Sequence, residues 1–185
     1  LGSDPRNILP LRKRIAAGEV AGPNIFLAGS IFPKDGHPAY LPADMQLPEA
    51  STPDEATQLA RSYMDLNLDG VKLFTGVFKG NKPVVNMDPA IAKAAVDVAH
   101  AQGKPAFAHP QNKTGVETVI AAGVDILLIG GENIFGVGDE VFGCALQDLI
   151  LARRGQLRHD GRDFLGSTGF GQNFFAFSVA HAIPA

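Results

Sequence analysis

The chain has 185 residues, of which 45% are apolar and 19% charged, so it is long enough and apolar enough for one domain with a hydrophobic core. Its net charge of −3, without a basic block, argues against nucleic-acid binding. No apolar run is long enough to span a bilayer, and the single cysteine, Cys144, excludes an internal disulfide. The sequence begins at Leu1 without a methionine, so no targeting segment can be judged, and cytoplasm and periplasm both stay open.

The first quarter of the chain predicts a helix, a strand and a long loop. Asp4 suits the N-cap of a helix and Pro5 its first position, so a helix is expected to begin there. The apolar stretch Asn24–Ser30 is typical of a short buried strand. A proline-rich loop over 31–51 follows and carries His37; loops of this length in compact domains are often functional.

The next segments alternate between helices and strands. Thr52–Glu55 has the pattern of a capping box and predicts a helix, and Val71–Phe74 predicts a buried strand. A loop rich in glycine, lysine and proline separates this strand from a second helix, which is expected to begin at Asp88 and to end at Gly103. The strand Lys104–Pro110 comes next.

A second capping box, Thr114–Glu117, predicts a helix that ends at Gly123, and Val124–Gly130 is expected to be a further strand. The strands are apolar on both sides, which is typical of a parallel sheet covered by helices. Both a (β/α) barrel and a doubly wound sheet fit this order. In a barrel the active residues stand at the carboxyl ends of the strands.

The last third of the sequence has a different character. We place a boundary at residue 130 and expect an unassigned segment over 131–185, rich in glycine and phenylalanine. Within it, Gly131–Gly143 reads as a loop, Ala145–Arg154 as a helix and Asn173–Ile183 as a strand.

Lys72 is the first candidate for chemistry because an ammonium inside an apolar strand is costly unless it is paired or chemically changed. Its tail could reach the mouth of the barrel and pair with a carboxylate. Its pKa could be lowered so that it forms a Schiff base with a carbonyl substrate. The neutral amine could also take up carbon dioxide and become a carbamate, an anionic metal ligand.

Two histidines complete the set of candidates. His109 follows Phe107 by two residues, so both side chains are expected on one side of the strand, and Pro110 ends the strand there. A neutral imidazole at that position suits zinc or a similar ion. His37 lies in a loop expected at the barrel mouth and is a candidate for substrate binding.

The order of four short motifs resembles the metal-dependent amidohydrolase superfamily, in the branch of imidazolonepropionase-like and prolidase-like hydrolases. The resemblance covers about residues 1–128. Its motifs are Gly70-Val71-Lys72, Ala99-His100-Ala101-Gln102-Gly103-Lys104-Pro105, Ala108-His109-Pro110 and Ala121-Ala122-Gly123-Val124-Asp125.

The resemblance implies a TIM-type parallel (β/α) barrel with one or two divalent metal ions, of which zinc is the expected one. By position, Lys72 would be the carboxylated lysine that bridges the metals and His109 a metal ligand. His100 matches a structural position of the family. Since a full barrel takes about 250 residues, the chain is expected to form an incomplete one, roughly half a barrel, with a divergent C-terminal segment.

Part of the family's site has no counterpart in the sequence. A first-strand His-x-His pair is absent, and Ile129 stands where the sixth strand should end in histidine. The aspartate expected as general base is missing too; Glu132 and Asp139 are the candidates to replace it.

Three functions therefore stay open. The chain could be a metal-dependent hydrolase that acts on amide or cyclic C–N bonds of a small molecule. It could be an inactive fragment or pseudoenzyme that self-associates through open sheet edges, so that a homo-oligomer is expected. It could also be a Schiff-base lyase that uses Lys72.

Overall fold

The structure is a computed structural model, and it describes residues 5–38, 47–79, 82–130 and 174–178. The main sheet has the strand order β2-β1-β3-β6-β7-β8. The strands are β1 (Ala28–Pro33), β2 (Glu49–Ala50), β3 (Gly70–Leu73), β6 (Ala106–Ala108), β7 (Ile126–Gly130) and β8 (Phe174–Ser178). All neighbours pair in parallel except β7 and β8, which are antiparallel.

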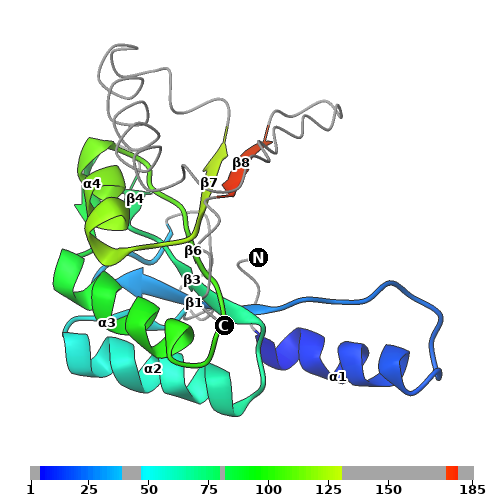
Figure 1. Ribbon diagram of the computed structural model, residues 1–185. Coiled ribbons are helices and arrows are strands. Elements are labelled where there is room, and N and C mark those ends of the chain that lie inside the picture. The colour runs from blue at the N-terminus through cyan, green and yellow to red at the C-terminus, as the bar shows by residue number, and fades with distance from the viewer. Residues whose placement is uncertain (1–4, 39–46, 80–81, 131–173, 179–185) are drawn as a thin grey trace, which may run out of the picture.

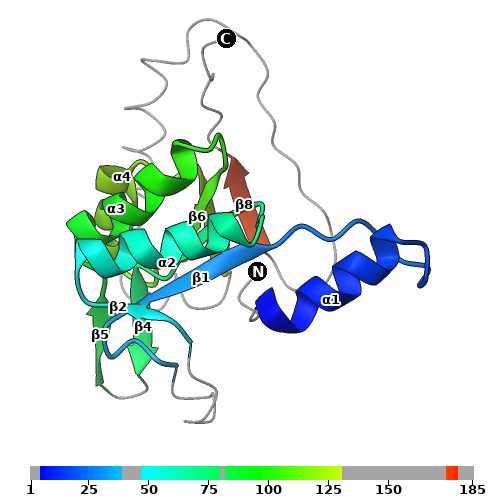
Figure 2. The ribbon, with the colours of Figure 1, turned by 90° about the horizontal axis from the view of Figure 1, so that it is seen from below.

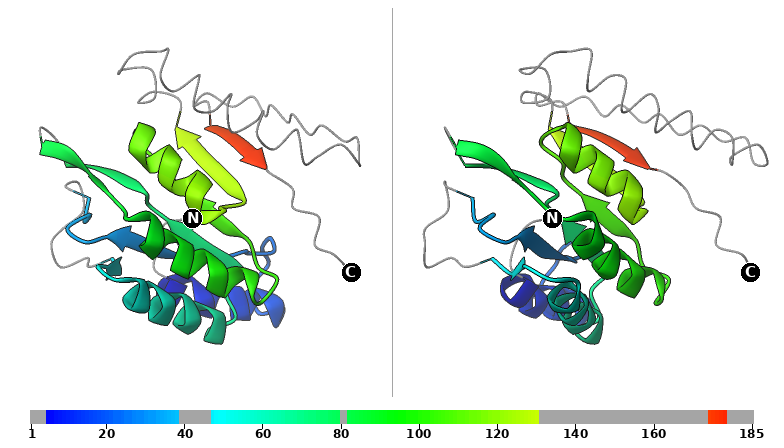
Figure 3. Two further views of the ribbon diagram at one scale, coloured as in Figure 1. Left: turned by 60° about the vertical axis from the view of Figure 1, so that its left-hand side comes forward. Right: turned by 90° about the vertical axis from the view of Figure 1, so that its left-hand side faces the viewer.

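Three of the helices form a layer on one face of this sheet. The helices are α1 (Pro5–Ala16), α2 (Pro53–Asp65), α3 (Pro89–His100) and α4 (Lys113–Ala122). Helices α2, α3 and α4 lie side by side across the strands, whereas α1 lies apart from them (Figure 1; Figure 2). We call the sheet face away from α2, α3 and α4 the inner face (Figure 3).

The strand order favours the barrel type over the doubly wound sheet. Strands β1, β3, β6 and β7 follow one another in the sheet as they do in the chain. A doubly wound sheet would reverse its direction at a switch point and would carry helices on both faces. The arrangement is compatible with part of a barrel wall, and the strands within the described ranges do not close into a barrel.

Local sequence signals explain where the helices begin and end. Thr52 caps α2 by accepting a hydrogen bond from the backbone N–H of Glu55 (3.2 Å), as predicted. Gly103 and Gly123 have φ angles of +64° and +78°, the left-handed conformation expected after a helix. The second predicted capping box is wrong, because α4 is capped two residues earlier by Asn112.

Two strand predictions need correction. Strand β1 begins at Ala28 rather than at Asn24 and extends to Pro33, because its pairing partners begin opposite Ala28 and include β2 at the far end. The predicted loop over 31–51 therefore starts later. The glycine- and lysine-rich connection after β3 contains a hairpin, β4 (Gly76–Lys79) and β5 (Lys82–Asn86), which the alternation of helices and strands did not indicate.

The C-terminal predictions are tested at one place only. Strand β8 lies within the predicted strand Asn173–Ile183, but it runs antiparallel to β7 and so breaks the all-parallel pattern. The predicted loop Gly131–Gly143 and helix Ala145–Arg154 lie outside the described residues, as do Glu132 and Asp139.

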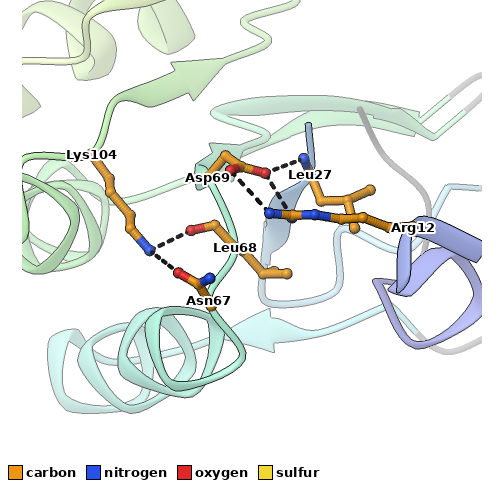
Figure 4. A network of polar contacts seen from close by, with 6 residues as sticks. All are labelled: Arg12, Leu27, Asn67, Leu68, Asp69 and Lys104. Atoms are coloured by element: carbon orange, nitrogen blue, oxygen red, sulfur yellow. Dashed lines mark hydrogen bonds and ion pairs between the residues drawn. The ribbon is translucent and has the colours of Figure 1, made fainter. Parts of the chain in front are cut away.

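Polar contacts connect the segments that lead into the amino-terminal ends of the strands (Figure 4). The Asp69 carboxylate accepts hydrogen bonds from the backbone N–H of Leu27 (2.8 Å) and from the Arg12 guanidinium (2.9 Å). Lys104 Nζ donates to the carbonyl of Leu68 at 2.6 Å. Arg12 is therefore part of a partly buried ion pair that ties α1 to Asp69, the residue before β3.

Candidate active site

The direction of Lys72 follows from its neighbours on β3. Val71 and Leu73 are fully buried in the core that α2, α3 and α4 form with the sheet. Because side chains alternate along a strand, Lys72 points to the inner face. The packing that fixes this strand thus forces the lysine onto the opposite side.

Strand register arranges the inner face in two rows. In the first row, Lys72 pairs with Ser30 of β1 and with Phe107 of β6. The second row, one pleat closer to the carboxyl ends, contains Phe32, Phe74 and His109. The rings of Phe32 and Phe74 stack with their centroids 4.0 Å apart, and the centroids of Phe74 and His109 are 5.9 Å apart.

Lys72 is buried without a charge partner in the described ranges. Its exposed fraction is 3%, and the contact found for Nζ is with the Phe74 ring, 5.1 Å from the centroid. Burial lowers the pKa of Lys72 from 10.5 to about 7. The predicted pairing with a carboxylate is not seen among these residues, and a large share of the amine is neutral near pH 7. A neutral amine is the nucleophile that both carbamate and Schiff-base chemistry need.

His109 follows β6 directly and is fixed from two sides. Its Nδ1 lies 2.8 Å from the carbonyl oxygen of Leu128, and its Nε2 lies 3.4 Å from Nε2 of Gln111. Burial lowers the pKa of His109, and the nearby charge of Lys72 lowers it further, whereas the bond to Leu128 raises it. Since a carbonyl oxygen only accepts, Nδ1 carries the hydrogen, and the lone pair of the neutral ring is on Nε2, on the side of Gln111. This is the arrangement found in metal-binding histidines.

His37 lies beyond the carboxyl end of β1. Its backbone N–H donates to Glu49 Oε1 (2.9 Å), and its carbonyl oxygen accepts from Lys79 Nζ (2.6 Å). These contacts hold the His37 segment between β2 and the β4–β5 hairpin. Its role in substrate binding stays a prediction.

The two candidate ligands fit a metal site only in part. His109 presents a lone pair, and a neutral Lys72 could be carboxylated, which would give two donors from adjacent strands. The described residues contain no group of three or more histidine, cysteine, aspartate or glutamate side chains that could hold a metal ion. His100 lies at the amino-terminal edge, where its Nε2 is 2.8 Å from Asp125 Oδ2, and so has the structural place expected of it.

Sequence reasoning missed three features near these residues. Gln111 contacts His109, and its only sequence signal is a polar side chain two residues after a histidine that ends a strand. The hydroxyl of Ser30, beside Lys72, is buried and has no hydrogen-bond partner within the described part of the chain. Val77 of the hairpin packs with Phe32 in a small apolar cluster over the carboxyl end of the sheet, and that contact depends on a hairpin that was not predicted.

No family model and no curated protein matches the chain, but solved structures do. A Xaa-Pro dipeptidase with bound methionine in its active site matches 63% of this chain and 32% of its own, with 26% identity and a TM-score of 0.54. A putative prolidase from Bifidobacterium longum matches 64% of this chain and 28% of its own, with 25% identity and a TM-score of 0.50. The ochratoxinase of A. niger (21% identity, 63% of this chain and 33% of its own, TM-score 0.54) supports the fold alone.

The chain therefore resembles amidohydrolase-superfamily structures over about 63% of its length, as the motifs predicted. It spans about a third of the length of these solved structures. None of the described helices is both long and apolar enough to cross a membrane.

Proposed function

We propose that this chain carries part of the active site of an amidohydrolase-type hydrolase that acts on an amide or cyclic C–N bond of a small molecule. The observation that carries the proposal is the pair Lys72 and His109, which face the same side of the sheet from adjacent parallel strands. The likeness to a Xaa-Pro dipeptidase supports an amide bond as the target, since the name of that enzyme describes cleavage of the amide bond before proline.

A divalent metal ion, zinc by expectation, would supply a Lewis acid that polarises the scissile carbonyl and activates water. His109 would hold it through Nε2, whose lone pair is available because Nδ1–H is bonded to Leu128. Lys72 would hold it as a carbamate: the neutral amine adds to the carbon of carbon dioxide, a C–N bond forms, and one proton leaves to solvent.

The surroundings of Lys72 favour this reaction. Burial keeps a large share of the amine unprotonated near pH 7, and only the unprotonated amine has the electron pair that attacks carbon dioxide. Lys72 is 3% exposed, so little water reaches the amine, and the centroid of the Phe74 ring lies 5.1 Å from Nζ. The Ser30 hydroxyl is a buried donor beside the same side chain.

The test is the zinc content of the purified chain after growth with added zinc. We expect bound zinc in the unaltered protein, less of it in Lys72→Met and in His109→Asn, and an unchanged amount in Lys113→Met, an exposed lysine on α4. A zinc content equal to that of the Lys72→Met/His109→Asn double variant would refute the proposal.

A Schiff-base lyase is the second candidate, and the lowered pKa of Lys72 favours it as well. Borohydride reduction in the presence of small keto acids distinguishes the two. A stable adduct on Lys72 would support the lyase, and its absence together with bound zinc would support the hydrolase.

An inactive, self-associating chain is the third candidate, and the partial donor set of the described residues favours it. We expect it to form a homo-oligomer through open sheet edges. Sedimentation at micromolar concentration tests this, because a monomer without zinc would contradict both this candidate and the hydrolase.

A further inference from the structure

Gln111 lies between His109 and the β4–β5 hairpin and contacts both. Its Oε1 accepts a hydrogen bond from the backbone N–H of Phe78 on β4, with a donor–acceptor distance of 2.6 Å. Its Nε2 lies 3.4 Å from Nε2 of His109. Together with the bond from His109 Nδ1 to the Leu128 carbonyl, these contacts form one chain from the hairpin to β7.

The two ends of this chain fix the direction of every hydrogen bond in it. The Phe78 N–H can only donate, so the Gln111 amide must turn its oxygen toward the hairpin and its NH₂ group toward His109. The Leu128 carbonyl can only accept, so Nδ1 of His109 carries the hydrogen. Nε2 of His109 is then an acceptor that faces a donor, and no other assignment satisfies all four groups.

The hairpin that sets the orientation of Gln111 is itself anchored. Val77, next to Phe78, is 4% exposed and packs in the apolar cluster with Phe32. Lys79, on the other side, donates to the carbonyl oxygen of His37. The hairpin therefore links the His37 segment to the imidazole of His109 through Gln111.

We propose that Gln111 is a positioning residue for His109, which holds the ring in the Nδ1–H form with the Nε2 lone pair ready for a ligand. The inference rests on the proposed role of His109 as a ligand, and it adds the residue that orients it. Gln111 gives the ring a donor that an incoming ligand can replace, so the ring is oriented before the ligand arrives. The amide of Gln111 itself stays held by Phe78.

The test uses zinc-free protein with ¹⁵N-labelled histidine, in which long-range proton–nitrogen spectra show which ring nitrogen carries hydrogen. In the unaltered chain we expect His109 as the Nδ1–H form. Gln111→Met removes donor and acceptor at nearly constant size, and we expect a mixture of ring forms. Gln111→Glu keeps an acceptor for Phe78 but turns an acceptor instead of a donor toward His109, so we expect hydrogen on Nε2 as well as on Nδ1. Gln58→Met, an exposed glutamine on α2, should leave the spectrum unchanged.

Hydrogen exchange of the Phe78 backbone amide helps to distinguish a positioning role of Gln111 from a purely structural one. Loss of its bond in Gln111→Met should speed exchange about tenfold, whereas Gln111→Glu should keep it slow. A purely structural role would change this exchange without changing the ring nitrogens of His109.

The proposal is overturned if His109 in the unaltered protein carries its hydrogen on Nε2 alone, or if both variants leave its ring signals unchanged. If Gln111→Met does not fold, Gln111→Glu and the spectrum of the unaltered chain still decide. Because no zinc is present, a failure of zinc binding would count against the proposed function without altering this result.

Discussion

Replacing Lys72 with methionine should stabilise the unmodified, metal-free chain at neutral and acidic pH. Methionine has a similar length, and its thioether end would lie over the Phe74 ring, where Lys72 Nζ now lies 5.1 Å from the centroid. The substitution removes an amine that is 3% exposed and has no charge partner among the described residues. It therefore removes a desolvation cost and leaves no ion-pair partner behind.

The size of the effect follows from the pKa of Lys72, which burial lowers from 10.5 to about 7. One pKa unit corresponds to about 1.4 kcal/mol, so the folded state loses about 3 to 5 kcal/mol when Lys72 must be charged. Because the folded-state pKa is the lower one, this loss is complete below pH 7 and disappears as the pH rises from 7 to 10.5. A cost of this size is a large share of the stability of a small domain.

Urea unfolding at pH 6 and at pH 10, in buffer free of carbon dioxide and metal, measures the difference. We expect Lys72→Met to be more stable than the unaltered chain by about 3 to 5 kcal/mol at pH 6 and by only about 1 kcal/mol at pH 10. Lys113→Met, whose side chain is 57% exposed, should change stability by less than about 0.5 kcal/mol at both values. Equal stabilities at pH 6 would refute the reasoning, because they would mean that Lys72 is charged in the folded chain at no cost.

Three further outcomes are expected. Bicarbonate labelled with ¹³C should give a carbamate carbon signal in the unaltered chain; persistence of that signal in Lys72→Met would contradict the assignment. Tyr63→Phe removes the buried hydroxyl that donates to the Ser30 carbonyl (2.7 Å) and should cost about 1 to 2 kcal/mol in urea unfolding, while an unchanged midpoint would mean that the bond contributes nothing. Asn112→Ala removes the N-cap of α4 and should cost about 0.5 to 2 kcal/mol; Asn112→Asp keeps a capping oxygen and should restore most of it, and equal losses in both would argue against capping.

The sequence predicts the local parts of the fold because their causes are local. Thr52 caps α2 through a bond to a residue three positions away, and glycine ends α4 because it adopts a positive φ at no cost. The same holds for the direction of Lys72, since alternation along one strand is enough to place it opposite Val71 and Leu73.

Features that depend on distant partners were not predictable in this way. Strand β1 begins at Ala28 because Gly70 lies opposite it, 42 positions further along the chain. The β4–β5 hairpin follows β3 where the alternation predicts a loop before the next helix, and Val77 is buried because Phe32 and Leu47 meet it there. The contact of Gln111 with His109 in turn depends on that hairpin, because Phe78 sets the orientation of the amide.

The two faces of the sheet differ in whether their buried side chains find suitable partners among the described residues. On the helix face, Val71 and Leu73 lie in a continuous apolar core, where apolar side chains need no hydrogen-bond or charge partner. On the inner face, Lys72 is buried without a charge partner in the described ranges, and the hydroxyl of Ser30 beside it has no hydrogen-bond partner there. Such groups cost free energy in an apolar setting, and costs of this kind concentrate at functional sites. The inner face is therefore where a ligand would gain most from binding, and His109 stands at its carboxyl end with Nδ1 2.8 Å from the Leu128 carbonyl oxygen and Nε2 3.4 Å from Gln111 Nε2.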